Sequence, residues 1–133
     1  MISLKTAIPG PNSLAIINRR KNAMPAGLAK STEVAIAHAE GGVVTDVDGN
    51  VLLDFAGGIG MMNIGHSNKQ VVDAMKAQLD KYIHICSLVA TPEPYVELAE
   101  LLNALTPGDF PKKTLLANSG SEAVENAVHI ARY

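Results

Sequence analysis

The chain of 133 residues has no tryptophan, only 4% aromatic residues and a single cysteine, Cys86. One cysteine cannot form an internal disulfide, which favours a reducing compartment, so we expect a cytoplasmic protein. No apolar run approaches the ~18 residues of a membrane span, and the first residues lack the apolar core of a signal peptide. The net charge of −2 provides no basic field. We therefore expect neither a membrane nor a nucleic acid as partner.

The composition is that of a folded protein, with 47% hydrophobic and 18% charged residues. Its four histidines have no metal-ligand spacing with Cys86 or with one another, so no metal site is predicted. Cys86, beside Ile85 and Leu88, is predicted to be a buried thiol. His66 is open to two interpretations, a pocket residue or a loop histidine held by backbone hydrogen bonds.

The first part of the chain, residues 1–41, is predicted to be a loosely specified arm. Several Pro and Gly residues interrupt it and leave room for one short helix, at about 13–23. The clearest local signal follows. Asp48-Gly49 suits the positive φ angles of a tight turn and lies between two apolar stretches, residues 42–47 and 50–55. These stretches predict a β-hairpin.

Two amphipathic helices are expected after the hairpin. Ser67 and Gln70 have capping-box spacing, and apolar residues then recur at helical intervals as far as Tyr82. A second helix begins at about Pro94 and ends at Thr106-Pro107-Gly108. Its apolar stripe is wide enough to predict burial on two sides.

A strand at 114–118 is predicted to lead through the turn Asn118–Ala123 into a last helix. Such a turn directs free N–H groups and the positive end of the helix dipole at one point, and Gly120 leaves room for a phosphate. Ser119 and Glu122 also have capping-box spacing, so the turn has a second interpretation as a plain helix start. The residues alone leave both open. Because the sequence ends at Tyr133 without a helix stop signal, we expect the front part of a larger protein.

Residues 107–132, which contain this turn, closely resemble the phosphate-binding region of class III pyridoxal-phosphate aminotransferases. The 4-aminobutyrate aminotransferases are the nearest group. Two further blocks, 48–66 with its Gly-Gly-Ile segment and 93–100, agree in order and approximate spacing. The resemblance covers nearly the whole chain from Gly42 onward.

The resemblance implies an α/β protein of fold-type I, with a small-domain segment at 42–90 and the start of the large cofactor-binding domain at 91–133. It implies that Gly120 and Ser121 hold the phosphate of pyridoxal 5'-phosphate. It also implies that Ile59 faces the substrate, although simple core packing is the alternative for that residue. The implied reaction moves an amino group from an ω-amino acid, such as 4-aminobutyrate, to 2-oxoglutarate in a homodimeric enzyme.

The family's Schiff-base lysine, and its other main catalytic residues, follow the phosphate-binding turn in sequence. Every lysine of this chain precedes that turn. No catalytic residue is therefore assigned, and the chain by itself is expected to be inactive. Two other hypotheses stay open: a noncatalytic truncated product that acts as an interaction fragment, and an unrelated phosphate-binding α/β module.

Overall fold

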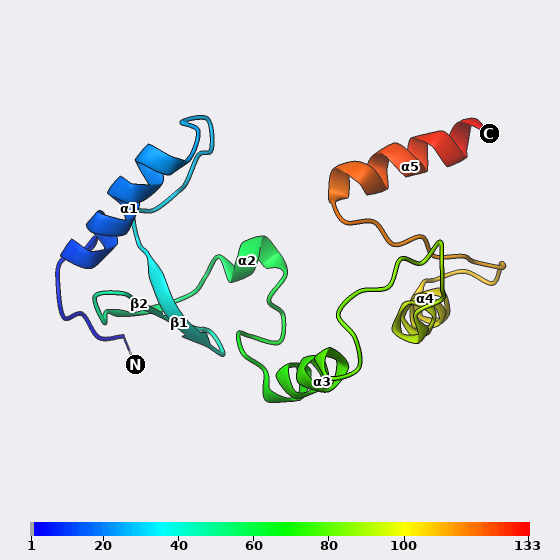
Figure 1. The fold of residues 1–133 in the computed structure, drawn as a ribbon, viewed down its shortest axis with the longest axis horizontal. Coiled ribbons are helices and arrows are strands. Elements are labelled where there is room, and N and C mark those ends of the chain that lie inside the picture. The colour runs from blue at the N-terminus through cyan, green and yellow to red at the C-terminus, as the bar shows by residue number, and fades with distance from the viewer. Residues whose placement is uncertain (1) are drawn as a thin grey trace. The chain divides into compact units, whose positions relative to one another are not determined.

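The computed structural model describes residues 2–133 and divides them into two compact units (Figure 1). The first unit ends at Lys81, and the second comprises Tyr82–Tyr133. The expected domain division into 1–41, 42–90 and 91–133 stays a prediction.

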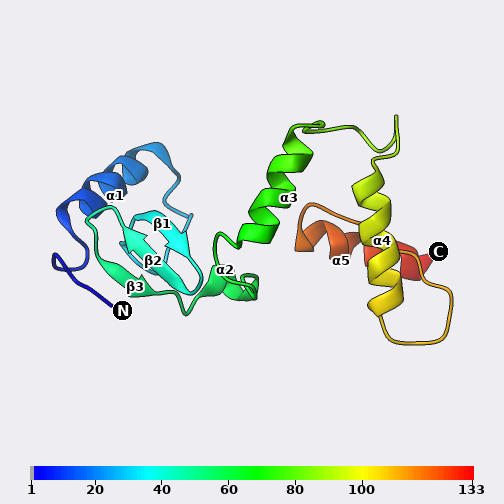
Figure 2. The same ribbon diagram turned by 90° about the horizontal axis from the view of Figure 1, so that it is seen from below.

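The first unit begins with a helix and a three-stranded antiparallel sheet. Strands β1 (Ile36–Glu40), β2 (Val43–Asp46) and β3 (Val51–Leu53) lie in the order β1-β2-β3 (Figure 2). In the β2–β3 hairpin Val44 pairs with Leu52, and Gly49 in the turn has a φ of 81°. The predicted hairpin is therefore confirmed, as is the short helix in the arm, which forms α1 (Pro11–Ala23).

Strand β1 was not expected, because it lies within the segment predicted to be a loosely specified arm. Its sequence, Ile-Ala-His-Ala-Glu, has little β-branched or aromatic content. Pairing with the valine-rich β2 forms the strand, in a register that shifts between Ile36 and His38. Tertiary pairing here outweighs a weak local preference.

A buried polar cluster connects the hairpin to the chain before it. Asn50 is fully buried, and its Oδ1 accepts the N–H groups of Lys5 and Thr6 at 2.7 and 2.9 Å. The side chain of Asp46, 2% exposed, accepts the Asn50 backbone N–H and the Asn50 amide, each at 2.7 Å. Because these buried polar groups are paired with one another, they avoid the desolvation penalty of unsatisfied groups.

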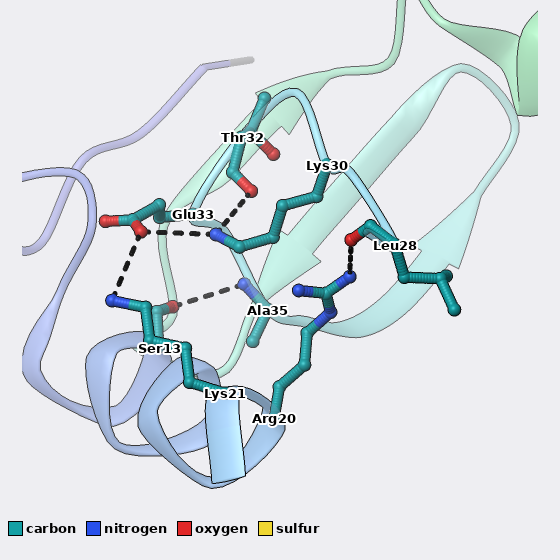
Figure 3. A network of polar contacts seen from close by, with 8 residues as sticks. All are labelled: Ser13, Arg20, Lys21, Leu28, Lys30, Thr32, Glu33 and Ala35. Atoms are coloured by element: carbon teal, nitrogen blue, oxygen red, sulfur yellow. Dashed lines mark hydrogen bonds and ion pairs between the residues drawn. The ribbon is translucent and has the colours of Figure 1, made fainter. Parts of the chain in front are cut away.

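A second set of polar contacts holds the segment that follows α1 (Figure 3). Lys30 donates to Glu33 at 3.2 Å and to the Thr32 carbonyl at 3.3 Å, and Arg20 donates to the Leu28 carbonyl. The buried Ser13 hydroxyl accepts the Ala35 N–H at 3.4 Å, just before β1. These bonds give the arm a defined path along α1.

The first unit continues with the short element α2 (Gly57–Gly60) and helix α3 (Lys69–Leu79). The helix after the hairpin is thus confirmed, but its predicted capping residue was wrong. Asn68 is the N-cap, and its side chain accepts the N–H groups of Gln70 and Val71. Ser67 cannot cap α3, because it has a φ of 53° and its hydroxyl donates to the Ala39 carbonyl at 2.8 Å.

The second unit contains helices α4 (Glu93–Leu105) and α5 (Gly120–Arg132), close to their predicted positions. The strand expected at 114–118 is not formed. A strand needs a hydrogen-bonded neighbour, and this segment pairs with no other strand of the described residues. Its backbone instead contacts a side chain, since the Leu116 N–H donates to the Tyr95 hydroxyl at 3.2 Å.

The apolar stripe on α4, predicted to be buried on two sides, is exposed. Leu101 is 55% exposed and Leu105 is 70% exposed. Neither α4 nor α5 has a buried residue. Between residues 2 and 133, no helix is long and apolar enough to cross a membrane.

Candidate functional site

The candidate site lies at the N-terminus of α5, where the sequence forms a complete capping box. The Ser119 hydroxyl accepts the Glu122 N–H at 3.2 Å, and the Glu122 carboxylate accepts the Ser119 N–H at 3.1 Å. The same carboxylate oxygen accepts the Asn118 N–H at 2.8 Å. The turn is therefore a capped helix start, and the N–H groups of Gly120 and Ser121 lie outside its capping box.

Gly120 and Ser121 are the first two residues of α5, and their N–H groups are free of partners within residues 2–133. A Cβ built on Gly120 would meet nothing within 4 Å, so the approach to this end of the helix is open. Free N–H groups at the positive end of a helix dipole favour a phosphate. Ser121, in this first turn of α5, also carries a hydroxyl, a side chain that can donate a hydrogen bond. These residues fit the phosphate of pyridoxal phosphate.

A cavity of about 530 Å³ lies beside the start of α5, and Asn118, which precedes that helix, is one of its lining residues. It is lined by residues 84–87, Pro92, Tyr95 and 115–118. Sequence reasoning missed it, because the extended segment 115–118 forms one wall only in the folded chain. Cys86, predicted to be buried, is exposed beside this cavity, since its neighbour Leu88 is 94% exposed and does not cover it.

Ile59 belongs to the first unit, so the structure does not group it with Gly120 and Ser121. It lies in α2 with φ 60° and ψ 50°, a left-handed conformation that is rare for a β-branched residue. Its side chain is 98% exposed. The Ile59 side chain is thus not packed in a core of the described residues. That Ile59 faces a substrate stays a prediction.

Near Ile59 the structure pairs two side chains that the sequence did not connect. His66 Nε2 lies 2.6 Å from Asp54 Oδ2, and both residues line a cavity of about 350 Å³. This hydrogen bond from His66, together with the Gly57 N–H, holds the pKa of Asp54 below its ordinary value. The eleven residues between them gave no sequence signal for the pair. Within residues 2–133, no group of three or more His, Cys, Asp and Glu side chains could hold a metal ion.

The family of the chain follows from its sequence match. The model of the aminotransferase class-III family matches residues 26–133. The chain belongs to the class III aminotransferases. This family depends on pyridoxal phosphate, and the chain is an α/β segment of its fold-type I architecture. The sequence resemblance and the predicted fold class are confirmed.

Two relatives match nearly the whole of this chain but only a part of their own length. The 4-aminobutyrate aminotransferase of Mycobacterium tuberculosis is 50% identical over 129 residues, which are 97% of this chain and 29% of that protein. The 5-aminovalerate aminotransferase DavT of Pseudomonas aeruginosa is 50% identical over 118 residues, 89% of this chain and 28% of that protein. The chain thus spans less than a third of the length of either relative.

A solved structure agrees with the sequence match. The taurine:2-oxoglutarate aminotransferase of Bifidobacterium kashiwanohense, in complex with pyridoxal phosphate and glutamate, is similar with a TM-score of 0.79 and 25% identity. The similarity covers 90% of this chain and 27% of that one. This similarity in fold agrees with the family that the sequence match shows.

Proposed function

We propose that this chain is part of a pyridoxal-phosphate-dependent ω-aminotransferase, which moves an amino group from 4-aminobutyrate to 2-oxoglutarate. The observation that carries the proposal is the 50% identity, over 97% of this chain, to a 4-aminobutyrate aminotransferase. A 5-aminovalerate aminotransferase with the same identity supports the wider class of unbranched ω-amino acids as donors.

In this proposal Gly120 and Ser121 bind the phosphate of the cofactor. The backbone N–H groups of both residues and the Ser121 hydroxyl donate to the phosphate oxygens, and the α5 dipole adds to the attraction. Bound pyridoxal phosphate supplies the electron sink for the reaction. Ile59 lines the path of the donor's carbon chain, where an exposed apolar side chain favours methylene groups over charged ones.

The 133 residues contribute binding and positioning in this proposal, and no residue among them is assigned to covalent catalysis. The intact enzyme is a cytoplasmic homodimer.

A second candidate, a noncatalytic fragment that associates with another chain, is favoured by one observation, the exposed apolar stripe on α4. The unrelated phosphate-binding module loses its support, since the chain belongs to the aminotransferase family.

A chimera tests the proposal in an intact enzyme. This chain replaces the aligned 129-residue segment of the M. tuberculosis enzyme, and transamination is measured with 4-aminobutyrate and 2-oxoglutarate. We expect activity that depends on added pyridoxal phosphate. A folded chimera that binds the cofactor but transfers no amino group from 4-aminobutyrate or 5-aminovalerate would overturn the proposed substrate class.

The phosphate site is tested by Ser121→Ala in the same chimera. Losing one hydrogen bond to a charged group should weaken cofactor binding by about 1–3 kcal/mol, measured by equilibrium dialysis. Ser31→Ala is the matched control, because Ser31 is exposed and lies outside both α5 and the cavity beside it. Unchanged affinity in Ser121→Ala would remove this residue from the site.

A further inference from the structure

The segment Gly57–Gly60 forms a left-handed turn. The φ angles of Gly57, Gly58, Ile59 and Gly60 are 51°, 63°, 60° and 86°. Three of these residues are glycines, which adopt such angles readily, whereas Ile59 has a branched side chain that disfavours them. Contacts of the Ile59 side chain do not explain the conformation, because that side chain is 98% exposed. Something outside the residue must hold it there.

Asp54 supplies hydrogen bonds that hold the start of this turn. Its Oδ1 accepts the N–H groups of Ala56 and Gly57, both at 3.0 Å. The Ala56 carbonyl then accepts the N–H groups of Ile59 and Gly60 at 2.7 and 3.2 Å. Asp54 Oδ1 is therefore linked to the Ile59 backbone by two successive hydrogen bonds, with Ala56 between them.

The other carboxylate oxygen connects Asp54 to the sheet. His66 Nε2 lies 2.6 Å from Oδ2, and the His66 backbone forms two hydrogen bonds with Gly41, at 2.8 and 2.9 Å. The Asp54 N–H donates to the Gly42 carbonyl at 3.0 Å. Gly41 and Gly42 form the connection between β1 and β2. Asp54 is thus fixed to the sheet on one side and to the turn on the other.

We propose that Asp54, oriented by His66, is a positioning residue that fixes the left-handed turn and so directs Ile59 at the ω-amino donor. The part concerning the donor rests on the proposed function. The part concerning the turn depends only on the contacts above. Asp54 touches neither donor nor cofactor in this proposal, and it acts on the donor through Ile59.

Hydrogen–deuterium exchange in the chimera tests the turn without any need for activity. Asp54→Ala removes the acceptor of two N–H groups, so exchange at residues 56–60 should become about tenfold faster or more. Asp54→Asn retains a side-chain oxygen that can accept these N–H groups, and should largely restore protection. Asp73→Asn is the matched control, because that carboxylate pairs with exposed Lys69 on α3.

Steady-state kinetics tests the effect on the donor. Asp54→Ala should raise KM for 4-aminobutyrate about tenfold with kcat within about twofold, as expected when a binding contact alone is lost. If Asp54 acts through Ile59, the double variant with Ile59→Ala should have the same KM as Ile59→Ala alone. Fully additive effects would contradict this.

The two measurements separate the two proposals. Unchanged exchange at residues 56–60 in Asp54→Ala, with β2 and β3 still protected, would overturn the positioning role. Faster exchange at this turn in a chimera that does not use ω-amino acids would retain the role of Asp54 in the turn and refute the proposed function. If Asp54→Ala unfolds the protein, His66→Ala provides the second variant, and its failure to increase exchange at 56–60 would equally overturn the proposal.

Discussion

Gly10 precedes α1 and has no side chain with which to cap it, so a residue from the hairpin turn does so instead. The two carboxylate oxygens of Asp48 accept the N–H groups of Asn12 and Ser13 at 2.8 and 2.9 Å. These N–H groups belong to the first turn of α1, which has no intrahelical acceptors for them. A side chain distant in sequence thus stabilises both the helix start and the contact between helix and hairpin.

This arrangement requires glycine at position 10. A Cβ there would lie 2.3 Å from Asp48 Cγ and 2.6 Å from Thr6 Oγ1. We predict that Gly10→Ala lowers the free energy of unfolding by about 1–3 kcal/mol, the cost of overpacking, measured by urea denaturation of the chimera. Gly27→Ala is the control, because a Cβ there meets nothing within 4 Å. Equal stabilities for the two variants would contradict the assigned close packing.

Asp48 also predicts a pH dependence of stability. Desolvation raises the pKa of its carboxyl, but the N–H groups of Ser13 and Asn12 outweigh this, so the pKa lies below its ordinary value. A carboxyl whose pKa is lower in the folded than in the unfolded state stabilises the folded protein at pH values above the unfolded pKa of about 3.9. This stabilisation is lost as the pH falls through the pKa of the folded state. Stability should therefore decline below about pH 4.

Denaturation of Asp48→Asn at pH 7 and pH 3 measures this contribution. The variant should lose less stability between the two pH values than the unchanged protein does, because its amide does not titrate in this range. Asp73→Asn, which alters an exposed carboxylate on α3, should retain the original pH dependence. A variant Asp48→Asn with an unaltered slope would exclude Asp48 as a source of the acid sensitivity.

At the scale of elements, most helices and the hairpin could be predicted from local signals. Asp48-Gly49 indicated a tight turn, and apolar periodicity identified α3, α4 and α5. What depends on distant partners could not be predicted in the same way. Strand β1 forms through pairing with β2, whereas 114–118 resembles a strand but has no partner among the described residues.

In the candidate sites, too, features set by consecutive residues could be predicted and features that need distant partners could not. The capping box at Ser119 and the exposed N-terminus of α5 follow from four consecutive residues, so the sequence was sufficient to predict them. The pair of Asp54 and His66 needs the chain between them to turn back through four glycines and a left-handed isoleucine. No periodicity or short motif encodes such a path.

The capping box itself yields a prediction for α5. Ser119→Ala removes the acceptor of the Glu122 N–H and should destabilise the helix start by about 1 kcal/mol. Exchange at the first turn of α5 should then become faster. Ser121→Ala is the matched control, because no cap bond involves its side chain within residues 2–133. If both variants exchange alike, the cap bond does not contribute to helix stability.

At the scale of the whole molecule, the amount of exposed surface is informative. The chain has an accessible surface of 10874 Å², whereas two separate compact proteins of the lengths of its units would expose about 8,000 Å². Many large apolar side chains contribute to the exposed surface. Ile17 is the only buried hydrophobic residue within the described part of the chain, and large apolar side chains are exposed along α3, α4 and α5. Such surface favours association.

We therefore predict that the 133-residue polypeptide, expressed by itself, associates and does not transaminate. Light scattering after size exclusion should give a mass above the monomer value of 14.0 kDa, and a dye for apolar surface should bind strongly. Leu101→Lys together with Leu105→Lys should increase the monomer fraction, because both side chains lie on the exposed stripe of α4. Leu88→Lys is a control with the same kind of charge change outside the helix.

The predicted absence of transamination has a separate origin from the predicted association. In the proposed function Gly120 and Ser121 bind the phosphate, but in this family the covalent bond to the cofactor requires a lysine that the resemblance assigns to none of these residues. Borohydride reduction in the presence of pyridoxal phosphate should thus label no single lysine stoichiometrically. A monodisperse monomer with one reducible cofactor per chain would refute both parts of the prediction, since it would show a complete core and a substitute lysine in the same polypeptide.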